Sequence, residues 1–112
     1  MNSAEYVEAC KKRLNCESYY QLARELNISN RELDFYRHGQ RTANAYACFK
    51  FGECLGIEPS IIIADIASEC EKNPLKRDYF KGFIGRCLKA VAALILTTAL
   101  MHTVSEESSF AV

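Results

Sequence analysis

The sequence lacks several patterns that mark common protein classes. Its six cysteines form no C-x-x-C pair, so we expect no zinc site. Residues 1–12 contain no apolar run of the kind found in a signal peptide, so we expect a protein of the reducing cytosol with small, buried thiols. There is no Gly-rich phosphate loop, and neither His38 nor His102 has a nucleophile or acid at a catalytic spacing. We therefore expect neither an enzyme nor a cofactor.

An overall excess of basic residues is also missing, since 14 Lys and Arg balance 14 Asp and Glu. The balance averages two unlike parts. Residues 1–71 hold eight basic and eleven acidic residues, a net charge of −3, whereas residues 72–112 hold six basic and three acidic residues, a net charge of +3. Any DNA contact in the first part must therefore come from a local basic patch.

Five short segments of the first 71 residues place apolar side chains at helical spacing, which predicts an all-α domain. Asn2 with Glu5 forms the expected start of the first helix, and the pairs Ser18/Gln21 and Ser29/Glu32 repeat this capping pattern. The expected helices cover about residues 3–14, 18–26, 29–38, 43–55 and 59–70.

Only the turn "NIS" separates the second and third of these helices. So short a connection cannot fold two helices antiparallel, and we expect them to cross steeply with Ile28 buried at the corner. This arrangement presents the second helix of the pair to a DNA groove. At about 100° per residue, Leu33 and Tyr36 point into the core. The outward face then carries Arg31, Phe35 and His38.

Three residues of this predicted helix have side chains suited to reading bases. Arg31 can donate two hydrogen bonds to guanine, Asn30 can pair with adenine, and Phe35 can contact a thymine methyl group. We therefore take Asn30, Arg31 and Phe35 as candidate base contacts.

The stretch "YQLARELNISNRELDFYRHGQRT", followed by "FGECLGIEPSIIIADI", resembles the lambda-repressor-like helix-turn-helix family of the Cro and XRE type. The resemblance covers about residues 1–67. It implies a five-helix domain that binds double-stranded DNA, with base contacts from Asn30, Arg31 and Phe35. It also implies phosphate contacts from Tyr19, Gln21, Gln40, Arg41 and Thr42.

The sequence departs from the family at three points, one of which is Arg37, where an acid is frequent before Gly39. Asn27 stands in the turn where Gly is usual, a mild change because Asn also accepts a positive φ. Tyr19 and Asn30 stand where glutamine is common, so no operator sequence can be carried over.

Residues 72–112 read as a separate part. The stretch "EKNPLKRDYF" indicates a boundary, and a basic amphipathic helix is expected from Phe80. Residues 90–104 carry no formal charge and predict a separate, hydrophobic C-terminal helix, which either spans a membrane or buries itself against other copies of the chain. Because the basic residues precede this segment, an anchored protein would keep its first domain in the cytoplasm.

Together these patterns predict a sequence-specific, DNA-binding transcriptional regulator of the repressor type, working as a homodimer. We expect it in the cytoplasm, free or attached to the inner face of the cytoplasmic membrane by the C-terminal helix. The layout also resembles that of small regulators encoded by filamentous bacteriophages. The alternative is an interaction module of the same fold, tethered to a membrane or oligomeric, that binds no DNA.

Overall fold

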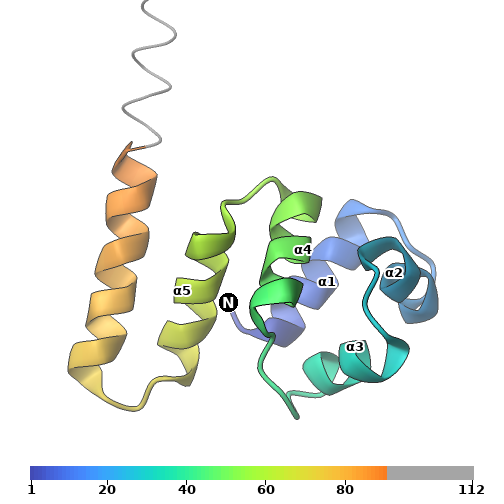
Figure 1. The fold of residues 1–112 in the computed structure, drawn as a ribbon, viewed down its shortest axis with the longest axis horizontal. Helices are drawn as coiled ribbons and strands as arrows, with labels where there is room; N and C mark the ends of the chain where they lie inside the picture. Colours follow the sequence, from blue (N-terminus) through green and yellow to red (C-terminus); the bar gives the residue numbers. More distant parts are fainter. Residues whose placement is uncertain (91–112) are drawn as a thin grey trace, which may run out of the picture.

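The computed structural model describes residues 1–90, which are all-α and form six helices without a strand (Figure 1). The five helices expected in the first 71 residues are confirmed, with ends within two residues of those predicted. Their bounds are α1 (Ser3–Arg13), α2 (Tyr19–Leu26), α3 (Asn30–Arg37), α4 (Ala45–Leu55) and α5 (Pro59–Cys70). A sixth helix, which the sequence predicted only from Phe80, begins at residue 74 and continues to residue 90.

The predicted capping by Ser18 and Ser29 is confirmed. The second half of the pattern, in which Gln21 and Glu32 would accept hydrogen bonds from the amides of these serines, is wrong. Ser18 and Ser29 each accept a hydrogen bond from the amide three residues later, at 3.1 Å. Gln21 does not reach the Ser18 amide and instead accepts from the Glu17 amide at 3.0 Å. Glu32 turns away from Ser29 altogether, because two side-chain donors from other positions hold its carboxylate. Only Asn2 with Glu5 makes the full reciprocal pair.

The five helices α1–α5 enclose one core, and α2 and α3 close it at one end (Figure 1). As the sequence predicted, Leu33 and Tyr36 of α3 are buried, and Ile28 is buried in the turn before it. The ring of Tyr6 stacks on that of Phe51 with centroids 6.0 Å apart, which joins α1 to α4. The largest fully buried side chains are Tyr36, Phe51, Leu22, Leu33, Ile62 and Val7.

The expectation of buried thiols holds for only half of the cysteines. Cys10, Cys16 and Cys48 are buried in the core. Cys54 and Cys87 are half-buried and Cys70 is exposed, so the prediction is wrong for these three. Cys70 shares the side of α5 that carries the buried Ile66, four residues earlier, but it is exposed as the last residue of the helix.

The sixth helix starts earlier than predicted because Asn73 and Pro74 begin a helix here. The Asn73 side chain accepts a hydrogen bond from the Leu75 amide at 2.9 Å, and proline is well suited to a first helical turn. Ala64 and Ser68 of α5 are buried although they lie on the face opposite to the core. Their burial places the sixth helix against this face, and Figure 1 shows it alongside α5.

Among residues 1–90, no helix is long and apolar enough to cross a membrane. The segment on which the membrane prediction rests, residues 90–104, lies outside the described residues except for its first position.

Candidate nucleic-acid interface

The turn between α2 and α3 is held in place from both sides. Asn27 takes a left-handed conformation with φ of 54° and ends α2, while the Ile28 amide donates to the Ala23 carbonyl at 3.0 Å. From α4, the Tyr46 hydroxyl donates to the Asn27 carbonyl at 3.0 Å, and the Asn27 side-chain amide approaches the same hydroxyl at 3.4 Å. A glycine, which has no side chain, could not make the contact between the Asn27 side-chain amide and the Tyr46 hydroxyl. The asparagine therefore supplies the positive φ and a link to α4 as well.

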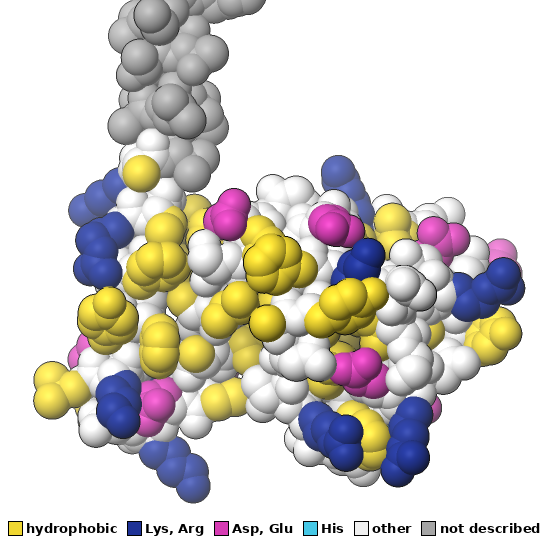
Figure 2. Space-filling model, in the orientation of Figure 1, with side chains coloured by type: hydrophobic (Ala, Val, Ile, Leu, Met, Phe, Trp, Pro, Cys, Tyr) yellow, Lys and Arg dark blue, Asp and Glu magenta, His cyan; other side chains and the backbone are white. Residues whose placement is uncertain are grey.

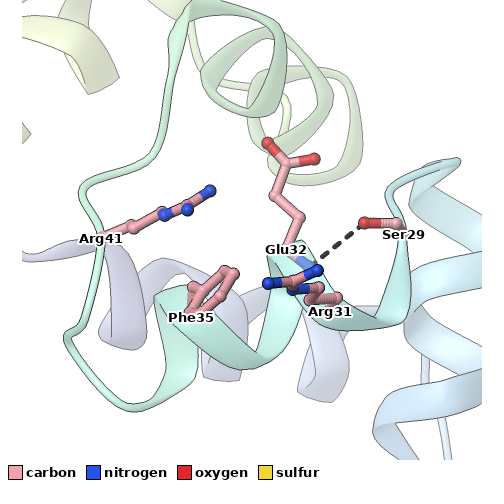
Figure 3. A pocket seen from close by; sticks show the side chains of 5 residues that line it. All are labelled: Ser29, Arg31, Glu32, Phe35 and Arg41. Carbon is pink, nitrogen blue, oxygen red and sulfur yellow. Dashed lines mark hydrogen bonds between the residues drawn. The ribbon is translucent and has the colours of Figure 1, made fainter.

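Two arginines stack on one phenylalanine at the exposed edge of α3, and we call them the Arg31–Phe35–Arg41 cluster (Figure 3). The guanidinium carbon of Arg41 lies 4.2 Å from the centre of the Phe35 ring, and that of Arg31 lies 5.5 Å away. Both arginines are exposed and the ring is half-buried. Figure 2 shows hydrophobic and basic side chains next to one another at the lower edge of the molecule, over α3. The cluster thus presents two cations and an aromatic surface to one partner.

The loop that carries Arg41 is fixed to α3 through its backbone. The amides of Gln40 and Arg41 both approach the Phe35 carbonyl, at 2.9 and 3.3 Å. Gly39, with φ of 68°, makes this reversal of the chain after α3. The position of Arg41 therefore does not depend on its own side chain.

Glu32 fixes α3 on the side next to α4, a role the sequence did not reveal. Its carboxylate accepts hydrogen bonds from the Tyr36 hydroxyl and from the Asn44 side-chain amide, the latter at 3.0 Å. Asn44 also caps α4 by accepting from the Ala47 amide at 2.9 Å. Burial, and then the hydrogen bond to Glu32, raise the pKa of Tyr36 to about 12. Glu32 thereby joins α3 to the start of α4.

The predicted phosphate contacts at the start of α2 are already engaged within the chain. The Tyr19 hydroxyl donates to the Glu8 carboxylate at 2.6 Å, a bond that raises the pKa of Tyr19. The charged groups of Lys11 and Arg37 lie close to its ring, 5.0 and 3.5 Å from the ring centre. The Gln21 side-chain oxygen accepts from a backbone amide, which leaves its NH₂ group for a phosphate.

The remaining predicted contacts lie on different sides of α3. Asn30 is exposed as the first residue of the helix, and Gln40 is exposed in the loop after it. The Thr42 hydroxyl lies 3.6 Å from the Cys70 sulfur, so this side chain faces α5 instead of the Arg31–Phe35–Arg41 cluster. The structure therefore brings together Arg31, Phe35 and Arg41, and directs Thr42 elsewhere.

Two further charged positions border this surface and were missed. Arg24 lies over the ring of the 60% exposed Tyr20, 6.0 Å from its centre, and so adds a cation on α2. Asp34 shares the outward face of α3 and pairs with Arg37 at 3.1 Å, which limits the positive charge there. The i, i+4 spacing of Tyr20 and Arg24 was the signal that could have identified the first.

Within residues 1–90, no three His, Cys, Asp or Glu side chains are placed to hold a metal ion. No family model, curated protein or solved structure matches this chain.

Proposed function

We propose that this chain is a sequence-specific transcriptional regulator that binds double-stranded DNA with α3 in the major groove. The fold we assign to residues 1–71 is the lambda-repressor-like helix-turn-helix. The single observation that carries the proposal is the Arg31–Phe35–Arg41 cluster on the exposed face of α3, directly after a three-residue turn. An arginine at the start of such a helix can reach guanine, and a cation in the loop behind it can reach the backbone.

The local charge supports this assignment although the domain as a whole is acidic. Arg24, Arg31 and Arg41 all lie on α2, on α3 or in the loop after α3. Of the nearby carboxylates, Glu32 is occupied by Tyr36 and Asn44, and Asp34 is paired with Arg37. Glu32 keeps its charge and Glu25 lies beside Arg24, so the three arginines exceed these two carboxylates by one. This small local excess of positive charge favours phosphate contacts.

Homodimerisation belongs to the proposal, because one such domain reads only a few base pairs. An apolar groove between α4 and α5 is a surface in residues 1–90 that could pair, with Ile63 39% exposed at its side. Two half-sites about one helical turn apart are expected. A footprint over a single half-site would contradict the dimer.

We further propose that the protein acts in the cytoplasm, with the apolar segment at residues 90–104 attaching it to the inner face of the membrane. Fractionation of cells tests this. A chain that resists alkaline carbonate extraction is anchored, whereas one that stays soluble without detergent uses the segment between protein copies.

The test of DNA binding is selection of sites from a random duplex library by the full-length chain. An enriched sequence should bind at least about 10³-fold more tightly than random DNA. Arg31→Ala should lose about 1 to 3 kcal/mol on that sequence and little on random DNA. The matched control is Lys12→Ala, which removes one exposed cation from the last turn of α1.

Failure to enrich any sequence, with Arg31→Ala and Lys12→Ala binding DNA alike, would contradict the proposal. The protein-interaction module would then be the better assignment for this fold.

A further inference from the structure

The sixth helix has two unlike sides, and only one of them is used within the described chain. Phe80, Phe83, Ile84 and Cys87 are half-buried and recur at helical spacing. This side faces α5, where Ala64 and Ser68 are buried. The other side, which we call the outward face, carries exposed apolar, basic and acidic side chains: Leu75, Asp78, Tyr79, Lys81, Arg86, Leu88 and Lys89.

The outward face exposes large apolar side chains to an unusual degree. Leu75 is 82% exposed, Tyr79 66% and Leu88 56%, although each sits on a regular helix. A helix turned only toward water places polar residues there. Large apolar side chains grouped with charges on an exposed face mark a surface that binds something partly apolar.

The charge of this helix is strongly one-sided. Residues 72–90 contain six basic residues and one acid, Asp78. None of the ion pairs found in residues 1–90 involves Lys81, Arg86 or Lys89. Arg86 lies over the Tyr79 ring at 5.9 Å, so a cation and an aromatic ring share one spot. The outward face is therefore complementary to an anionic partner.

We propose that the outward face binds the surface of a bilayer that contains anionic phospholipids. Such a surface offers both things this face needs: negative headgroups for the three cations and the headgroup–acyl boundary for the leucines and tyrosine. Duplex DNA offers phosphates but no apolar layer for Leu75 and Leu88. In this binding mode the helix lies along the membrane plane, which differs from a segment that spans the bilayer.

This surface is separate from the proposed DNA-binding side. The sixth helix and the α2–α3 pair lie at opposite ends of the molecule (Figure 1). Basic and hydrophobic side chains gather over the sixth helix (Figure 2). Lipid binding at one end therefore need not block the other, and the inference does not depend on DNA binding.

The chain contains no tryptophan, so single tryptophans can report each surface separately. Tyr79→Trp places one on the outward face, and Tyr20→Trp, at a similarly exposed site on α2, is the matched control. Full-length variants are mixed with phosphatidylcholine vesicles with or without about 30% phosphatidylglycerol. The emission of the tryptophan at position 79 should shift to the blue only with the anionic vesicles, and that at position 20 should not shift.

Charge removal completes the test. Each basic residue near an anionic surface strengthens partitioning about fivefold, so the triple variant Lys81→Gln, Arg86→Gln, Lys89→Gln should bind anionic vesicles about 100-fold more weakly. Binding to neutral vesicles should not change, because residues 91–112 are identical in both proteins. Circular dichroism checks that the exposed substitutions leave the helices intact.

Three results would overturn the inference: an equal blue shift at position 79 with neutral and anionic vesicles, unchanged binding of the triple variant to anionic vesicles, or a blue shift at position 79 with duplex DNA in place of vesicles. Since DNA binding is tested separately, by site selection and with Arg31→Ala, failure here and failure of the proposed function remain distinguishable.

Discussion

Replacing Arg41 with alanine should change how DNA binding responds to salt while leaving the fold intact. The Arg41 backbone is held by the Phe35 carbonyl and the side chain is exposed, so the loop keeps its position. The substitution mainly removes the stacking of the guanidinium on the Phe35 ring, at 4.2 Å. At an exposed site such stacking contributes about 0.5 to 1 kcal/mol. The free energy of unfolding should therefore fall by no more than about 1 kcal/mol.

The effect on binding follows from counterion release. Removing one phosphate contact reduces the slope of log K against log salt by about 0.9, which is a factor of about 3.5 between 50 and 200 mM salt. Arg41→Ala should thus bind both selected and random duplexes more weakly than the wild type at 50 mM. This deficit should shrink about 3.5-fold by 200 mM. Arg31→Ala should instead lose affinity mainly on the selected sequence.

The assay is fluorescence anisotropy of labelled duplexes titrated with full-length protein over a salt series, with Lys12→Ala as the control for net charge. A wild-type slope retained in Arg41→Ala would refute the assignment of Arg41 to phosphate. The same slope change in Lys12→Ala would show that net charge alone, and not this loop, sets the salt response.

Three other predictions concern stability and can be checked by urea unfolding. Gly52→Ala should lower the free energy of unfolding by about 1 to 3 kcal/mol, because a Cβ there would lie 2.6 Å from the Ile57 carbonyl oxygen. The control Gly85→Ala, where a Cβ would meet open space, should not destabilise the protein. Equal effects of the two substitutions would contradict the close approach at Gly52. Tyr36→Phe should cost about 0.5 to 1.5 kcal/mol at neutral pH. Because the folded pKa of Tyr36 is raised to about 12 from 10.0, wild-type stability should fall as pH rises from about 10 to 12, and Tyr36→Phe should fall less; parallel curves would count against this. Tyr46→Phe should lose about 0.5 to 1.5 kcal/mol and speed hydrogen exchange at the Ile28 amide, while unchanged exchange would show that the α4 contact does not hold the turn.

The helices of the first 71 residues were predictable because their signals are local. Ser18, Ser29 and Pro59 mark helix starts, and Asn27 and Gly56 take the left-handed conformation that ends a helix. Such signals act within four residues of the chain and need no knowledge of the fold.

The contacts that the sequence did not reveal join residues far apart in the chain. The local pattern predicts a cap for Glu32, but Asn44, twelve positions later, holds its carboxylate once the loop has folded. The family resemblance places Tyr19 against DNA, yet Glu8 of α1 holds its hydroxyl. The Thr42 hydroxyl lies near the Cys70 sulfur, a contact between residues 28 positions apart that forms only when α5 folds back beside this loop. Local patterns thus located the candidate surface but not the contacts that orient it.

The supports of α3 all lie on one side of the helix. Leu33 and Tyr36 anchor it in the core, and the Glu32 carboxylate ties it to α4. The side chains of Arg31 and Phe35 stack on each other on the opposite side, while the loop behind them is fixed through backbone atoms. In the proposed binding mode, the residues that contact the partner and the residues that hold the fold therefore occupy separate positions of one eight-residue helix. Substitution at Arg31 or Phe35 can change the preferred partner while the scaffold persists, which leaves evolution or a protein engineer free to retarget this domain.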